Sequence, residues 1–292
     1  MTGMRGIRVV TKVRCELGEC PLWLPQRKRL LWFDIFGPAV YEAGEGDAGL
    51  RVFRFEAPVS AAAIIDESSV AIGCTSGLYR LNLDSGERTP MVSFAGDRPI
   101  RTNDGRVDTR GGFWFGTMGE PYVEGAGTLY RYANGELATI RTGLNVPNCL
   151  AFSPDGRRAY FSDTVDHRIL YFPLDEKSGM PSAEPELFLD LSAEGIHPDG
   201  AVVDVEGGLW NAQWGSGRVV RYLPDGTLDQ VIEFPVSRTT CPAFGGPDHR
   251  TLFVTTARAG MSKEELAKEP LAGSVFAVDL EIAGLPESTL RI

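Results

Sequence analysis

The sequence lacks the features that would place it in several common classes of protein. Its 292 residues include 29 Lys and Arg against 39 Asp and Glu, a formal net charge of −10. Such an acidic chain has no basic face for nucleic-acid phosphates or for an anionic membrane surface. The charge is typical of a solvated surface that keeps an enzyme in solution. We therefore expect neither nucleic acid nor membrane as a partner.

Long apolar runs and paired cysteines are also missing. No run of about 18 apolar residues is present, so no membrane-spanning helix is predicted. Residues 1–13 alternate basic and apolar side chains and lack the apolar core of a signal peptide. The five cysteines are odd in number and widely spread, without a Cys-x-x-Cys motif. This pattern favours a reduced, cytoplasmic protein.

Helical periodicity is nearly absent as well. The one candidate is residues 262–268, where Ser262 and Glu265 form a capping-box pattern. In contrast, 34 glycines and 19 prolines separate short runs of β-branched and aromatic residues. Many short strands with turn signals between them indicate a sandwich, a barrel or a propeller. The predicted strands include 30–33, 70–73, 113–115, 159–161, 219–222 and 252–254.

An internal repeat decides among these architectures. Six positions, which we call the start positions, are each followed four residues later by a large apolar residue. They are 41, 43, 45, 51 and 41 residues apart, close to the period of propeller blades. The repeat predicts an all-β, six-bladed β-propeller as a single domain over 1–292, with every start position at one mouth of the central channel. The start positions are Glu19, Ser60, Asn103, Asn148, Asp199 and Thr240.

Two further strands complete this prediction. Residues Ile7–Val13 read as a strand with no first blade of its own. We expect this strand to pair with the last blade and close the propeller, which leaves no long edge exposed. Residues Glu186–Asp190 are expected to form an outer strand within the long segment 175–198.

Equivalent positions in a ring converge on one axis, which would gather Glu19, Asn103, Asn148 and Asp199. Two carboxylates at one channel mouth repel each other unless a cation or a shared proton lies between them. Oxygen ligands suit hard cations such as Ca²⁺, Mg²⁺ or Mn²⁺. Arg101, two residues before Asn103, can hold an anionic oxygen at the same mouth. The alternative is that these polar residues only cap strand ends and turns.

Six short motifs carry a more specific pattern. Together they resemble the gluconolactonase-like family that also contains regucalcin (senescence marker protein) and the luciferin-regenerating enzymes. The resemblance covers nearly the whole chain and implies a six-bladed propeller with one divalent metal at the channel mouth. The motifs are Leu17–Trp23, Arg101–Asp108, Phe115–Met118, Pro147–Ala151, Pro198–Gly200 and Phe244–Asp248.

The resemblance also implies roles for individual residues. Glu19, Asn148 and Asp199 correspond to the metal ligands of the family. Asp199 is in addition the implied catalytic acid and base. Arg101 and Asn103 correspond to substrate contacts.

The chain departs from the family pattern at two positions and leaves a third open. Cys20 and Cys149 stand where the family usually has glycine, and Cys241 takes the same place in the sixth repeat. We interpret these thiols as small core fillers, with a thiolate ligand or nucleophile as the alternative. Glu120 lies close to the place where some relatives carry an acidic substrate contact, soon after Gly-Thr-Met.

The predicted function is that of a hydrolase of carbohydrate metabolism. We expect a divalent-metal-dependent lactonase, a carboxylic ester hydrolase that opens a sugar-acid lactone, either aldono- or aldaro-, to the acid. The cofactor would be one Ca²⁺, Zn²⁺, Mg²⁺ or Mn²⁺ ion, and the partner a small-molecule lactone. Two alternatives stay open: a phosphotriester or aryl-ester hydrolase on the same metal site, and a non-enzymatic metal-binding propeller. The oligomeric state is not indicated.

Overall fold

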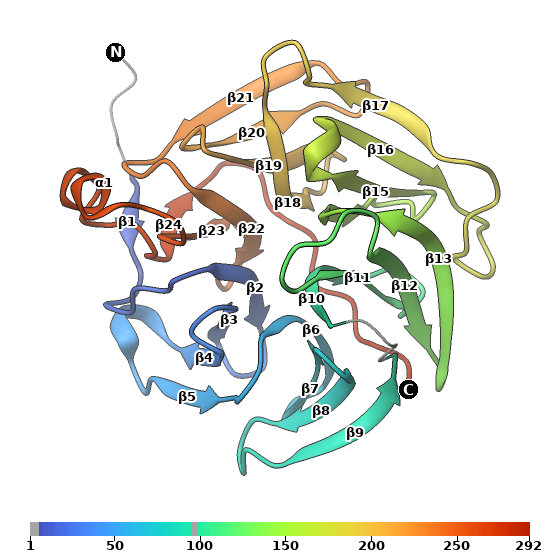
Figure 1. Cartoon of the computed structure of the whole chain (residues 1–292), viewed down its shortest axis with the longest axis horizontal. Coiled ribbons are helices and arrows are strands. Elements are labelled where there is room, and N and C mark those ends of the chain that lie inside the picture. The colour runs from blue at the N-terminus through green and yellow to red at the C-terminus, as the bar shows by residue number, and fades with distance from the viewer. Residues whose placement is uncertain (1–5, 95–98) are drawn as a thin grey trace. The chain divides into compact units, whose positions relative to one another are not determined.

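The protein is described by a computed structural model that covers residues 6–94 and 99–292. Its strands form six four-stranded antiparallel sheets in sequence order, the fold class of a six-bladed β-propeller (Figure 1). One short α-helix accompanies them. Within the two described ranges, no helix is both long and apolar enough to cross a membrane. The predicted fold class is therefore confirmed.

The chain divides into two compact units, each with three sheets. The first unit comprises Met1–Arg54 and Asp199–Pro286. Its sheets have the strand orders β2-β3-β4-β5, β18-β19-β20-β21 and β1-β24-β23-β22. The strands are β1 (Arg8–Val9), β2 (Gly18–Leu24), β3 (Arg29–Asp34), β4 (Ala39–Ala43), β5 (Arg51–Arg54), β18 (His197–Val203), β19 (Leu209–Trp214), β20 (Arg218–Tyr222), β21 (Leu228–Glu233), β22 (Thr239–Gly245), β23 (Thr251–Thr256) and β24 (Phe276–Asp279).

The second unit comprises Phe55–Pro198 and Glu287–Ile292. Its sheets have the orders β6-β7-β8-β9, β10-β11-β12-β13 and β14-β15-β16-β17. The strands are β6 (Val59–Asp66), β7 (Ser69–Cys74), β8 (Gly77–Asn82), β9 (Arg88–Ser93), β10 (Ile100–Val107), β11 (Phe113–Gly119), β12 (Gly127–Ala133), β13 (Glu136–Leu144), β14 (Pro147–Phe152), β15 (Arg158–Asp163), β16 (Arg168–Pro173) and β17 (Glu186–Asp190). The single domain over 1–292 stays a prediction.

The N-terminal strand joins the last sheet, as the sequence predicts. Strand β1 pairs antiparallel with β24, and Arg8 donates to Asp279 at 2.9 and 3.2 Å. The strand has two residues instead of the seven predicted. It ends early because Thr11 and Lys12 turn to Asp47, whose carboxylate accepts from the hydroxyl of Thr11 and from the N–H of Lys12.

Two other local predictions are confirmed. Helix α1 (Lys263–Lys268) begins at Ser262, whose hydroxyl accepts from the N–H of Glu265 at 3.2 Å. The Glu265 carboxylate accepts in return from the Ser262 N–H at 2.7 Å, so the capping box is complete. The predicted outer strand is β17, with the bounds Glu186–Asp190.

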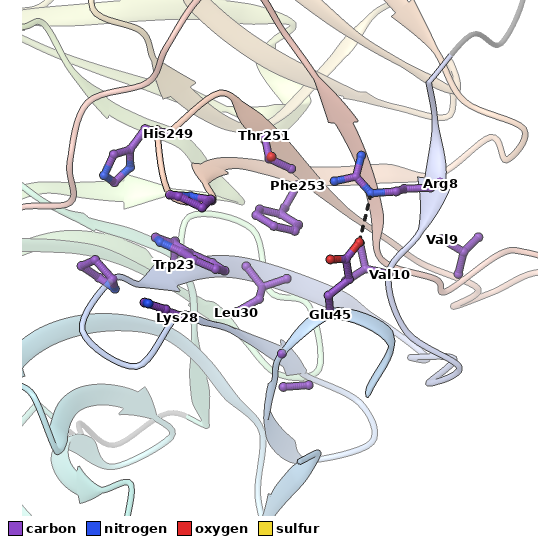
Figure 2. Close-up of a pocket in the computed structure, with 15 residues that line it drawn as sticks. Arg8, Val9, Val10, Trp23, Lys28, Leu30, Glu45, His249, Thr251 and Phe253 are labelled. Atoms are coloured by element: carbon purple, nitrogen blue, oxygen red, sulfur yellow. Dashed lines mark ion pairs between the residues drawn. The ribbon is translucent and has the colours of Figure 1, made fainter. Parts of the chain in front are cut away.

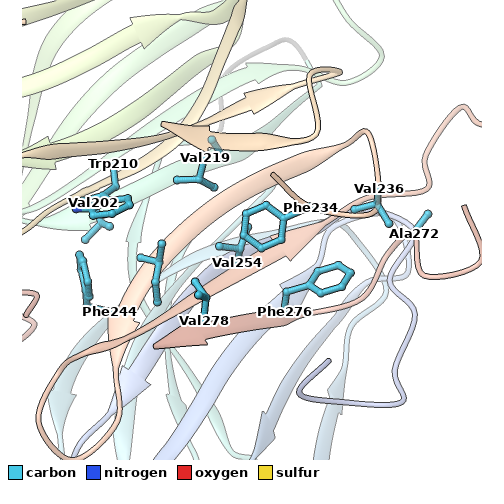
Figure 3. Close-up of a cluster of buried hydrophobic side chains, with 12 residues drawn as sticks. Val202, Trp210, Val219, Phe234, Val236, Phe244, Val254, Ala272, Phe276 and Val278 are labelled. Carbon is cyan, nitrogen blue, oxygen red and sulfur yellow. The ribbon is translucent and has the colours of Figure 1, made fainter. Parts of the chain in front are cut away.

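Aromatic side chains dominate the core of each unit. In the first unit, Trp210 packs edge to face against Phe244 with ring centroids 6.1 Å apart, and Phe234 packs against Phe276 with ring centroids 5.7 Å apart (Figure 3). Each such buried side chain contributes about 1.5–3 kcal/mol by its removal from water. Strands such as β11 and β22 are buried at every position, so they are stable only where the surrounding structure covers both of their faces.

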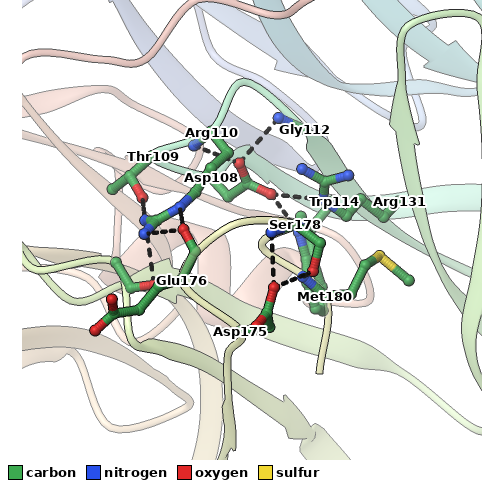
Figure 4. A network of polar contacts seen from close by, with 11 residues as sticks. Asp108, Thr109, Arg110, Gly112, Trp114, Arg131, Asp175, Glu176, Ser178 and Met180 are labelled. Carbon is green, nitrogen blue, oxygen red and sulfur yellow. Dashed lines mark hydrogen bonds and ion pairs between the residues drawn. The ribbon is translucent and has the colours of Figure 1, made fainter. Parts of the chain in front are cut away.

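A buried carboxylate holds a hairpin together in the second unit (Figure 4). Asp108 accepts from Nε1 of Trp114 at 2.9 Å and from Nε of Arg131 at 2.6 Å. Its other oxygen accepts from the N–H groups of Arg110 and Gly112 at 2.7 and 2.9 Å. Both oxygens of this carboxylate, which is fully buried, are thus saturated by donors from the turn and from the two following strands.

The first unit repeats this arrangement at Asp204. Its carboxylate accepts from Nε1 of Trp210 at 2.8 Å and from Nε of Arg221 at 2.7 Å. Arg221 is 2% exposed and also donates to Asp229 and Glu206. In both units the tryptophan follows the aspartate by six residues, so the network is a structural part of the repeat.

Candidate functional site

Each start position of the repeat lies near the beginning of the first strand of its sheet. In five sheets the pairing with the second strand shifts around this position, which is the signature of a β-bulge. A bulge bends the strand and aims a side chain away from the regular pleat. The shifts lie at Glu19/Leu22, Ser60/Ala62, Thr102/Gly105, Asn148/Ala151 and Thr239/Pro242.

The residue after a start position often has a left-handed backbone. Cys20, Ala61 and Cys149 have φ of 45°, 51° and 62°. This conformation costs a residue with a side chain about 1–2 kcal/mol, whereas glycine adopts it at almost no cost. Glycine is therefore favourable at the position after a start position. The side chains of Cys20 and Cys149 are buried, as is that of Cys241. Their burial supports the interpretation as small core fillers.

Four predicted site residues form one hydrogen-bonded row in the second unit. Nε of Arg101 donates to Glu120 at 2.9 Å, and Nη1 donates to Oδ1 of Asn103 at 2.7 Å. Nδ2 of Asn103 donates to Oδ1 of Asn148 at 2.9 Å. Arg101, Asn103 and Asn148 are each at most 6% exposed. The structure therefore brings together Arg101, Asn103, Glu120 and Asn148.

Thr164 fixes which way the Asn148 amide points. The Thr164 hydroxyl donates to the carbonyl of Pro198 at 2.8 Å, so it acts as acceptor toward Nδ2 of Asn148 at 2.7 Å. A hydroxyl has one proton to donate, and this order leaves no other assignment. Oδ1 of Asn148 must then face Asn103, and its second lone pair remains available for a further donor or a cation.

Hydrogen bonds also join the first strands of neighbouring sheets in this unit. The Ser60 hydroxyl, on β6, donates to the carbonyl of Asn103 on β10 at 2.5 Å. The carboxylate of Asp104, on β10, accepts from the N–H of Leu150 on β14 at 2.8 Å. The start positions Ser60, Asn103 and Asn148 are thereby held at the same end of three adjacent strands.

The first unit gathers the other three start positions in the same way. Glu19 and Asp199 are buried, with 5% and 4% of their surface exposed. The hydroxyl of Thr240, on β22, donates to the carbonyl of Gly18, just before Glu19, at 2.6 Å. This contact aligns the start of β22 with the start of β2.

Strand β18 is aligned with β22 by a close approach. A side chain at Gly200 would collide with Cys241, which follows Thr240. Only glycine allows the two backbones to come this near. The amide of Asn211 donates to the carbonyl of Asp199 at 3.0 Å and so holds the backbone of β18 at this position. Asp199 and Glu19 thus begin two strands that flank β22.

Two buried aspartates hold the loops that lead into Glu19 and Asn148. Asp34 and Asp163 each end the second strand of their sheet, 15 residues after the start position. Each carboxylate accepts from two consecutive backbone N–H groups of the loop and so fixes the orientation of the loop backbone. The N–H groups are those of Glu16 and Leu17 for Asp34, at 2.9 and 3.0 Å, and of Asn145 and Val146 for Asp163, at 2.7 and 2.9 Å.

The predicted ligand set fits a hard divalent cation by its chemistry. Glu19, Asn148 and Asp199 offer only oxygen donors, and all three side chains are buried. Two are carboxylates and one is an amide. No group of three His, Cys, Asp or Glu side chains in the described ranges is arranged to hold a metal ion.

The sequence patterns did not indicate a role for Asp34, Asp163 or Thr164. Extending the repeat by 15 residues would have found the two aspartates, since both follow a phenylalanine in the second strand within three residues. Thr164 carries no such signal, because nothing in the repeat marks a threonine directly after Asp163.

The chain is similar to several known proteins. Residues 17–258 match the model of the SMP-30/Gluconolactonase/LRE-like region. The chain is 36% identical over 284 residues to 6-deoxy-6-sulfogluconolactonase of Pseudomonas putida, covering 96% of this chain and 97% of that protein. It is 35% identical to L-arabinolactonase of Azospirillum brasilense, with 95% and 93% covered. The crystal structure of regucalcin from Agrobacterium tumefaciens, titled a calcium-binding protein, superposes with a TM-score of 0.95 at 35% identity, covering 98% of this chain and 97% of that one.

Proposed function

The chain belongs to the SMP-30/gluconolactonase/LRE-like family, and from this we propose that it is a divalent-metal-dependent lactonase that opens a sugar-acid lactone to the acid. Relatives named as sugar lactonases support the enzyme class, a carboxylic ester hydrolase. The observation that carries the proposal is the polar row that runs from the partly exposed Glu120 through the buried side chains of Arg101 and Asn103 to Asn148.

Glu19, Asn148 and Asp199 are the residues proposed to hold the metal. Their oxygen donors favour Ca²⁺, Mg²⁺ or Mn²⁺ over Zn²⁺. A bound divalent ion would supply Lewis-acid chemistry, since it polarises a carbonyl and stabilises negative charge on its oxygen. The calcium-binding relative supports a divalent ion without deciding which one.

Asp199 is the proposed acid and base. Lactone hydrolysis forms a bond from water oxygen to the carbonyl carbon and breaks the bond from that carbon to the ring oxygen. A proton must leave the water and a proton must reach the ring oxygen. The Asp199 carboxylate can accept the first and return it as the second.

Arg101, Asn103 and Glu120 would orient the substrate hydroxyls. The charge of Arg101 is matched by Glu120 at 2.9 Å, and the arginine side chain is 6% exposed against 36% for the glutamate. The free carboxylate of an aldarolactone would have to compete with Glu120 for this arginine. We therefore propose neutral aldonolactones as better substrates than aldarolactones.

Proton release over a panel of lactones tests the proposal, with the protein stripped of metal and then supplied with each divalent ion. The panel includes a phosphotriester and an aryl ester. We expect lactone hydrolysis that depends on metal, and a loss of turnover of about 10²–10⁴-fold in Asp199→Ala. Near-normal turnover in a folded, metal-loaded Asp199→Ala would refute the acid/base assignment. Faster hydrolysis of the phosphotriester or aryl ester, or no metal binding at all, would favour the alternatives.

Replacing Glu120 tests the proposed preference for neutral lactones. Glu120→Gln should raise the preference for an anionic lactone over a neutral one by about fivefold, because a partly exposed ion pair contributes up to about 1 kcal/mol. Glu124→Gln removes an exposed carboxylate nearby and serves as the control. An equal effect of both variants on the ratio of kcat/KM values would contradict a specific role for Glu120.

A further inference from the structure

A cavity lies wholly within the first unit, away from the start positions. It has a volume of about 480 Å³ and opens beside the β2–β3 and β22–β23 hairpins (Figure 2). Glu19 begins strand β2, whereas Pro25 and Lys28 line the cavity beyond its end. The residue of β2 that lines the cavity nearest to Glu19 is Trp23, four residues away, which is about 13 Å along an extended strand. The cavity is therefore separate from the proposed catalytic residues of this unit, and its size is that of a small-molecule site.

One wall of the cavity is a rigid aromatic pair. Trp23 stacks on Phe253 with ring centroids 5.7 Å apart and planes 11° from parallel. Gly245 packs against both rings, where any Cβ would come within 2.8 Å of each. Leu30 and Val10 add aliphatic surface. The indole of Trp23 is only partly buried, so a flat apolar group can lie against this wall.

The two ends of the cavity differ in charge. At one end Arg8 is engaged by Glu45 at 3.8 Å and by Asp279 at 2.9 Å (Figure 2). At the other end lie Lys28 and His249, and Lys28 forms no ion pair with any residue in the described ranges. One end is thus neutralised, and the other presents an uncompensated cation.

His249 adds a hydrogen-bond donor to that cation. Its Nδ1 is buried and has no hydrogen-bond partner among the residues that the structure describes. A buried N–H without an acceptor is less tolerable than a buried lone pair without a donor. The proton of the neutral ring is therefore better placed on Nε2, which makes Nε2 a donor.

We propose that this cavity binds a flat aromatic carboxylate. The ring of the ligand lies against Trp23, and its carboxylate accepts from Lys28 and His249. The ligand contacts Arg8 of strand β1 and Val10 directly after it, so binding also ties the N-terminal segment to the β2–β3 hairpin. This site is independent of the proposed lactonase function.

Isothermal titration with 2-naphthoate tests the site, with 2-naphthamide as the neutral analogue of the same shape. We expect saturable binding of the acid and binding of the amide that is weaker by about fivefold, the effect of one partly exposed charge contact. Lys28→Gln should weaken binding of the acid by a similar factor and leave binding of the amide unchanged. Lys177→Gln, at an exposed lysine outside the cavity, is the matched control.

Lactone hydrolysis by Lys28→Gln should equal that of the unchanged protein, which separates this site from the catalytic one. The proposal is refuted by equal binding of acid and amide, or by equal binding to Lys28→Gln and Lys177→Gln. Absence of saturable binding at millimolar probe refutes it as well. Displacement of the probe by a sugar acid would place the probe at the lactone site and would also overturn the proposal.

Discussion

Replacing Asp204 by asparagine should reveal how strongly the buried networks hold the fold. One oxygen of Asp204 accepts from Trp210 and Arg221, and the other accepts from the N–H groups of Glu206 and Gly208. An asparagine has one acceptor oxygen, so its NH₂ group must face two donors on one side or the other. Two stranded donors, together with the loss of the negative charge beside the buried Arg221, cost about 3–5 kcal/mol.

Thermal and denaturant unfolding followed by circular dichroism measure this loss. We expect the unfolding temperature to fall by roughly 10 °C, since 1 kcal/mol shifts large domains by about 2–4 °C. Asp225→Asn is the control, because its exposed carboxylate accepts only from the turn at Thr227. A loss below about 1 kcal/mol in Asp204→Asn would refute the argument from stranded donors.

The matching variant in the second unit extends the experiment. Asp108→Asn removes the equivalent network, so it should cost a similar free energy. If residues 1–292 form a single cooperative domain, each variant shifts one common transition. If the two units unfold separately, each variant shifts its own transition and leaves the other in place.

Three further predictions concern single side chains. Thr164→Val should lower the free energy of unfolding by about 1–3 kcal/mol, because Asn148 loses a buried acceptor, and Thr164→Ser should restore most of it; equal stabilities would exclude the orienting role. The hydrogen bond from Arg8 holds the pKa of Asp279 below its ordinary value of 3.8, so its small contribution to stability is present above that pH and lost as the pH falls through the lowered pKa. Asp279→Asn should therefore show a shallower loss of stability in acid, measured by pH-dependent melting. Iodoacetamide should label Cys74 in the native protein and all five cysteines only after unfolding, as mass spectrometry can show, because the other four thiols are buried.

Much of the architecture could be predicted because its signals are local. The start positions and the apolar residue four places later lie within one strand, so their period is visible in the sequence. The capping box of Ser262 and Glu265 spans three residues, and Glu186–Asp190 is bounded by its own turn residues. The N-terminal strand was predicted with the right partner and the wrong length, because its end depends on Asp47, which is distant in sequence.

The sequence by itself determined the repeat, the fold class and the set of candidate residues, since each follows from spacing along the chain. Only the tertiary structure decided how those residues are held. The Asn148 amide takes its direction from Thr164 and Pro198, and Arg101 takes Glu120 as its partner from 19 residues away. Such contacts join strands that are distant in sequence and meet only in the folded chain. The direction of each hydrogen bond also depends on all the neighbours of the side chain, and these neighbours come from several strands.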